Sequence, residues 1–143
     1  MGQVKGNGNT RSPRLATAPL VRAMHAALLA RFGGLAGTVD EGKLESALAR
    51  AQQRMAYGNP PPTVFDLAAE SAFGIARNHP FSDGNKRVAL ATADMVLWLN
   101  GVEFAADQAE TVVVIQTLAA GELSVEQLAA WLQQNSVKTK RRR

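Results

Sequence analysis

Apolar residues recur at helical spacing along most of the chain, and short runs of glycine, asparagine and proline separate the repeats. Apolar side chains three or four positions apart lie on one face of a helix, so this spacing predicts amphipathic helices. The predicted helices cover 18–32, 43–57, 63–78, 107–120 and 124–134. The last of these opens with Ser-Val-Glu-Gln, a capping box that satisfies free N–H groups at a helix start.

One further helix differs from the others because apolar residues occupy nearly all of its faces. It covers 86–99 and ends at Asn100-Gly101, two residues that tolerate the left-handed conformation at a helix end. A helix that is apolar all round is typically buried. The β-branched run at 111–115 would also suit a strand, but both of its ends carry helix signals. The chain is therefore predicted to be an all-α, single-domain bundle of about six helices around a buried central helix.

The charged residues divide the chain into a folded body and two basic ends. Of the 143 residues, 1–17 form a polar lead-in, 18–134 form the domain and 135–143 form a basic tail. Both ends are predicted to be disordered. The net charge of +4 comes from these ends, since 15–137 hold 8 basic and all 12 acidic residues. A nucleic-acid-binding domain carries its cations on a folded face, so direct nucleic-acid binding is not expected.

The composition also bears on where the protein works. There are no cysteines, which agrees with a reducing compartment. No apolar run approaches the roughly 20 residues of a membrane span, and the N-terminal residues lack the apolar core of a signal peptide. We expect a soluble, cytoplasmic protein with no membrane partner.

Candidate chemistry concentrates in one stretch, His79–Arg87, between two predicted helices. A helix that begins here presents unpaired N–H groups, which bind anions, and the neighbouring basic residues add positive charge. Asp83 would repel a phosphate unless a magnesium ion lay between them. Histidine side chains ordinarily have a pKa of about 6.5, so His79 is a residue type suited to take a proton from a hydroxyl near neutral pH. Together these groups predict a phosphoryl- or nucleotidyl-transfer site.

The other histidine, His25, lies within the first predicted helix. No carboxylate or second histidine is paired with it locally. It is therefore predicted to be a packed or surface residue, and the alternative is a functional residue that contacts substrate or stabilises a loop.

The sequence His-Pro-Phe-Ser-Asp-Gly-Asn-Lys-Arg at 79–87 resembles the signature loop of the Fic/Doc family, written H-P-F-x-[D/E]-G-N-[G/K]-R. The resemblance extends to Arg-Phe-Gly-Gly-Leu-x-Gly at 31–37, to the predicted helix around 44–54 and to Asn-Gly-Val at 100–102. It covers about 20–132, and these flanking segments are similar to the death-on-curing (Doc) toxin branch.

This resemblance implies a role for most residues of the loop. Family members transfer part of a nucleotide triphosphate to a hydroxyl of a target protein. His79 would be the general base, Asp83 the ligand of Mg²⁺, and Phe81 a plug that anchors the loop in the core. The phosphates of ATP would be held by Gly84, Asn85 and Arg87, with Lys86 beside them.

Lys86 bears on which group is transferred. Adenylylating members carry glycine at this position, whereas members of the Doc branch carry lysine and transfer the terminal phosphate of ATP. The resemblance therefore implies a toxin that phosphorylates a target protein, with translation elongation factor Tu as the target. Pro80 and Gly84 follow the adenylylating branch, so AMP transfer is the alternative.

Regulation by a partner is also implied. Some relatives carry an inhibitory [S/T]-x-x-x-E-[G/N] helix, and no serine or threonine of this chain begins such a pattern. A cognate antitoxin would then supply the inhibitory segment. The family's target-docking flap would fall at Tyr57, Gly58 and Asn59. A non-catalytic, antitoxin-binding module with the same fold is the alternative from another class.

Overall fold

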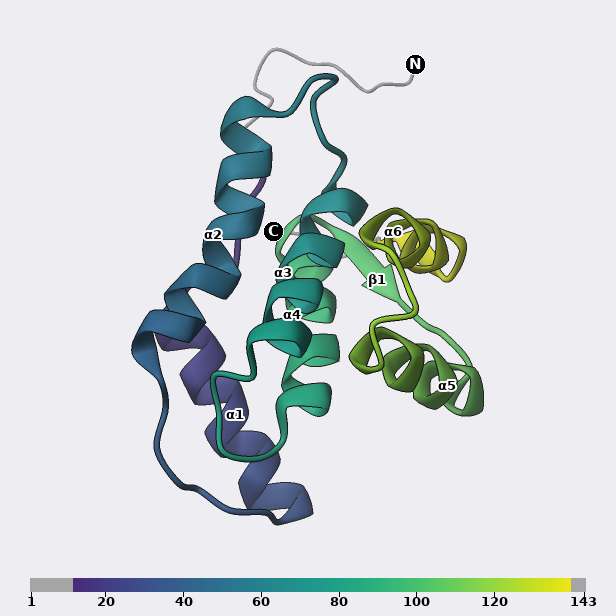
Figure 1. The fold of residues 1–143 in the computed structure, drawn as a ribbon. Coiled ribbons are helices and arrows are strands. Elements are labelled where there is room, and N and C mark those ends of the chain that lie inside the picture. The colour runs from purple at the N-terminus through teal and green to yellow at the C-terminus, as the bar shows by residue number, and fades with distance from the viewer. Residues whose placement is uncertain (1–11, 140–143) are drawn as a thin grey trace.

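The computed structural model describes residues 12–139 and confirms an all-α domain (Figure 1). Each expected helix is present, and its ends lie within two residues of the expected positions. None of the helices in this part of the chain is long and apolar enough to cross a membrane. The helices are α1 (Ala18–Phe32), α2 (Glu41–Tyr57), α3 (Val64–Asn78), α4 (Asn85–Leu99), α5 (Gln108–Ala119) and α6 (Val125–Gln134).

Side-chain caps explain where most of the helices begin. The first N–H groups of a helix have no partner within it, and a short polar side chain just before the helix can accept from them. The predicted capping box of α6 forms between Ser124 and Gln127, and α3 has one between Thr63 and Asp66. Asp40 caps α2 in the simpler way, accepting from the Lys43 N–H at 3.0 Å.

The centre of the bundle is a pair of helices rather than α4 alone. α3 packs against α2, α4 and α6, whereas α4 packs against α3, α1 and a short strand. α3 also has the larger share of buried residues, because alanine and glycine on several of its faces let neighbouring helices approach. One such close approach is at Gly74, which lies against the main chain of Ala47 in α2.

Two segments expected to be disordered are ordered in part. Ser136–Lys138 form β2, which pairs antiparallel with β1 (Val102–Phe104), so the tail predicted at 135–143 begins as a strand. In the expected lead-in, the Asn100 side chain bonds both the N–H and the carbonyl of Arg14, and Ala16 is buried. These contacts join residues far apart in sequence, which local composition does not predict. The predictions for 1–11 and 140–143 concern residues outside the part of the chain that the structure describes.

The contact at Gly74 gives a test of the α2–α3 packing. A Cβ added at Gly74 would overlap the Ala47 carbonyl, and main chain cannot move aside as a flexible side chain can. We expect Gly74→Ala to lower the free energy of unfolding by about 3 kcal/mol. Denaturant unfolding followed by circular dichroism measures this difference.

Gly42 supplies the matched control for that experiment. It lies in the first turn of α2, is exposed, and a Cβ there would meet only Asp40 Oδ1 at an ordinary 3.6 Å. Gly42→Ala should therefore stabilise the protein by about 0.5–1 kcal/mol. Equal effects of the two alanines would contradict the close packing at Gly74.

Candidate active site

The predicted site loop joins the end of α3 to the start of α4, at the lower end of the molecule in Figure 1. His79 ends α3 in the left-handed conformation, with φ 52°, and donates its N–H to Ile75 O at 3.1 Å. Pro80 then prevents the helix from continuing. The His79 side chain is exposed at this junction. The fold thus presents the imidazole to solvent on a constrained main chain.

Phe81 and Asn85 hold the loop against the core. The Phe81 side chain is only 4% exposed and belongs to the apolar core. The Asn85 amide binds both main-chain groups of Phe81: its Oδ1 accepts from the N–H at 3.1 Å, and its Nδ2 donates to the carbonyl at 2.8 Å. Asn85 is itself buried. Its side chain therefore shapes the loop.

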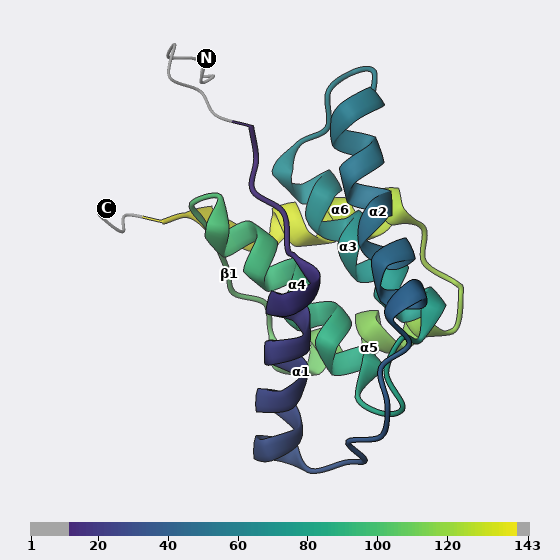
Figure 2. The same ribbon diagram turned by 90° about the vertical axis from the view of Figure 1, so that its left-hand side faces the viewer.

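A second loop, residues 33–40 between α1 and α2, lies alongside the first. Val39 pairs with Phe81 as in a short β-bridge, and the Asp40 N–H donates to Pro80 O at 2.8 Å. The Ser82 hydroxyl accepts from the Thr38 N–H and donates to the Thr38 carbonyl, each at 3.2 Å. The two loops are adjacent in both Figure 1 and Figure 2. Sequence reasoning did not place 33–40 at the site.

Asp83 is held at three points and still leaves its carboxylate exposed. Oδ2 accepts from the Leu35 N–H at 3.2 Å, and Oδ1 accepts from the Gly84 N–H at 2.8 Å. The Asp83 carbonyl accepts from His25 Nε2 at 2.9 Å. Each carboxylate oxygen keeps a second lone pair for a hard cation. His25 is packed, as predicted, but its contact with Asp83 was not foreseen.

The start of α4 has the features of an anion site. Gly84 precedes the helix with φ 83°, and no side chain caps the N–H groups that follow. Lys86 and Arg87 are exposed, and within residues 12–139 neither forms an ion pair. The Arg87 guanidinium lies over the Phe32 ring, 4.7 Å from its centre. Free N–H groups, the helix dipole and two unneutralised cations together favour a phosphate.

The segment expected to be a docking flap, Tyr57, Gly58 and Asn59, lies elsewhere. α2 and α3 are antiparallel, since Asn78 bonds Lys43 O and Arg54 pairs with Asp66. Tyr57 therefore adjoins the start of α3, and His79 follows its end, so about 22 Å of helix separates them. The segment expected to be the flap therefore lies at the opposite end of α3 from His79, and 33–40 is the loop that borders the site.

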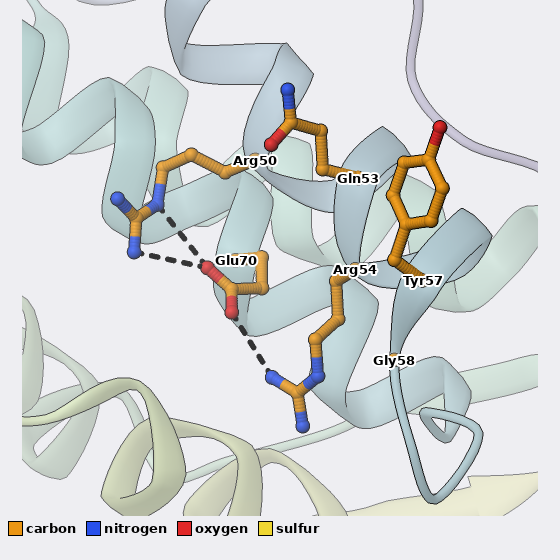
Figure 3. A pocket seen from close by; sticks show the side chains of 6 residues that line it. All are labelled: Arg50, Gln53, Arg54, Tyr57, Gly58 and Glu70. Carbon is orange, nitrogen blue, oxygen red and sulfur yellow. Dashed lines mark hydrogen bonds and ion pairs between the residues drawn. The ribbon is translucent and has the colours of Figure 1, made fainter.

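Tyr57 and Gly58 instead border a pocket of about 390 Å³ (Figure 3). Glu70 of α3 points between two arginines of α2 there. It accepts from Arg50 Nε at 3.1 Å and from Arg54 Nη1 at 3.0 Å. These guanidinium groups are already neutralised, in contrast to the cations at the start of α4. The pocket is thus lined by a network of ion pairs that joins α2 to α3.

Comparison of the sequence with known proteins identifies the family. The model of the Fic/DOC family matches residues 15–97. The chain belongs to the Fic/Doc family. It is 38% identical over 107 residues to "Protein kinase doc" of Escherichia phage P1, covering 75% of this chain and 83% of that protein. It is also 43% identical over 76 residues to "Toxin Doc" of Mycolicibacterium smegmatis, covering 53% and 58% of the two chains.

The two roles considered for Asn85 can be separated by experiment. Asn85→Ala would leave the Phe81 N–H and carbonyl without partners in a buried place. We expect it to lower the free energy of unfolding by roughly 3 kcal/mol. Denaturant unfolding without nucleotide provides the measurement.

Asn78→Ala is the control for Asn85. It also removes an amide, but that amide makes one exposed hydrogen bond, to Lys43 O, so the expected cost is about 1 kcal/mol or less. If Asn85→Ala unfolded like the wild type and lost only nucleotide affinity, the side chain would serve the phosphates and not the loop.

Proposed function

We propose that the chain is the toxin of a toxin–antitoxin pair, and that it uses ATP and Mg²⁺ to phosphorylate a hydroxyl group of a target protein in the cytoplasm. The observation that carries this proposal is the loop from His79 to Arg87. It combines an exposed imidazole, an exposed carboxylate and an uncapped helix start on one short, clamped segment. The similarity to a phage protein named as a protein kinase supports phosphate transfer.

In the proposed reaction His79 is the general base. It takes the proton of the target hydroxyl as the hydroxyl oxygen attacks the terminal phosphorus of ATP. The bond from that phosphorus to the oxygen bridging it to the middle phosphate breaks, and ADP leaves. Arg87 and the N–H groups at the start of α4 stabilise negative charge that develops on the phosphate oxygens. Lys86 provides a further cation.

The residues present fit a magnesium ion. Asp83 is an exposed residue and offers carboxylate oxygens, the ligands that Mg²⁺ prefers. No group of three or more metal-ligating side chains occurs within residues 12–139. A single carboxylate agrees with the habit of Mg²⁺ to keep waters and bind substrate phosphates beside one or two protein ligands. When bound, the ion would neutralise charge between Asp83 and the phosphates.

The target and the regulator follow from the same proposal. Elongation factor Tu is the first target to test, and the loop 33–40 is the surface beside His79 against which a target segment would lie. A cognate antitoxin would restrain the enzyme by covering the site. The relative named "Toxin Doc" supports a toxin role.

Transfer of label from ATP tests the reaction. The protein is incubated with elongation factor Tu and ATP labelled at either the α- or the γ-phosphate. We expect γ-label on the target, and a loss of 10²–10⁴-fold in rate for His79→Ala because the general base is removed. α-Label on the target would indicate AMP transfer instead. If neither label were transferred and His79→Ala acted like the wild type in a growth assay, both enzymatic reactions would be excluded. The protein would then be a non-catalytic, antitoxin-binding module.

Lys86 gives a second test, of the transferred group. Lys86→Gly removes a cation and opens space at the start of α4, so γ-label transfer should fall about 10²-fold. We expect some α-label transfer to appear. Lys86→Met is the control, because it removes the charge and keeps most of the bulk. α-Label transfer by the methionine variant would show that charge, and not space, decides between the two reactions.

A further inference from the structure

His25 of α1 makes two contacts with the site loop, 58 positions away in sequence. Its ring stacks on the Phe81 ring, with 3.9 Å between the ring centres and an angle of 15° between the planes. Its Nε2 lies 2.9 Å from the Asp83 carbonyl oxygen. The side chain is 5% exposed. A carbonyl oxygen only accepts hydrogen bonds, so Nε2 carries the hydrogen.

The contact with Asp83 fixes the direction of one peptide group. The Asp83 carbonyl and the Gly84 N–H belong to the same trans peptide and point in opposite directions. Because His25 holds the oxygen on the α1 side, the Gly84 N–H points to the other side. There it donates to Asp83 Oδ1 at 2.8 Å, next to the uncapped start of α4.

The peptide has an alternative orientation that would damage the site. Glycine adopts positive and negative φ about equally well, so the main chain at Gly84 does not itself prevent the peptide from turning over. In the reversed orientation the carbonyl oxygen would face the start of α4. Its partial negative charge would repel a phosphate, and the N–H that supports the Asp83 carboxylate would be lost.

We propose that His25 is a positioning residue, which keeps the Asp83–Gly84 peptide oriented with its N–H toward the phosphate site. This inference rests on the proposed function, because it assigns to α1 the task of preparing the loop for Mg·ATP. The donor on Nε2 is the group that acts, and the stacking on Phe81 holds the ring in place. His25 is predicted to touch neither the nucleotide nor the target.

Three variants separate the donor from the packing. His25→Phe keeps an aromatic ring for Phe81 and lacks the donor. His25→Gln keeps a donor, since its Nε2 is four bonds from Cα as in histidine, and lacks the ring. Ala26→Ser is the matched control, because Ala26 is the exposed neighbour of His25 on the same helix.

Binding of a non-hydrolysable ATP analogue with MgCl₂ is measured by calorimetry for each full-length variant. We expect His25→Phe to bind about tenfold more weakly, the effect of one lost hydrogen bond that orients a binding group. His25→Gln should stay within about threefold of the wild type, and Ala26→Ser should be unchanged. Wild-type affinity in His25→Phe, or equal weakening by Gln and Phe, would overturn the proposal. Should His25→Phe fail to fold, His25→Met replaces it, because methionine fills irregular space and donates no hydrogen bond.

Nuclear magnetic resonance of the nucleotide-free protein gives a readout that does not depend on the proposed function. The His25 imidazole should be the Nε2–H tautomer, and His25→Phe should shift the Gly84 amide resonance while His25→Gln largely restores it. An Nδ1–H tautomer, or an unmoved Gly84 resonance, would overturn the inference. If the wild type failed to bind Mg·ATP but these signals behaved as expected, the proposed function alone would be wrong.

Discussion

The paired hydrogen bonds between the Asn85 amide and the main chain of Phe81 are the constraint on which the site depends. They close the turn between α3 and α4 and place the Phe81 ring in the core. With Phe81 fixed, His79 on one side and Asp83 on the other have little freedom. A residue that would be assigned to phosphate binding from its place in the motif is therefore the one that gives the motif its shape.

Two further segments complete the site around this turn. The loop 33–40 contacts the turn through Val39 and Thr38, and α1 contacts it through His25. Glycine is favoured where these segments meet, because Gly34 has φ 127° and a Cβ there would lie 2.9 Å from Asp83 Oδ2. The site is thus assembled from three stretches of sequence, although its chemistry is carried by one.

The sequence was sufficient for features that depend on local order. Helical periodicity and capping residues predicted all the helices, and the reactive groups are contiguous, so the site loop could be found without the fold. Features that depend on distant contacts were missed. The pairing of β1 with β2 joins two three-residue segments with little strand signal. Because α2 and α3 are antiparallel, Tyr57 lies at the opposite end of α3 from His79. His25 looked isolated because its partner is a main-chain carbonyl, which no residue type reveals.

The cations of α2 and those at the start of α4 differ in whether carboxylates of the protein neutralise them. Near the middle of α3, Glu70 forms ion pairs with Arg50 and Arg54 of α2, and these pairs join the two helices. At the start of α4, Lys86 and Arg87 meet no carboxylate within the described chain, and the helix dipole adds to their charge. Positive charge left without a partner weakens folding through repulsion. Unpaired positive charge is therefore expected at a place where a bound anion, and not the protein itself, supplies the opposite charge.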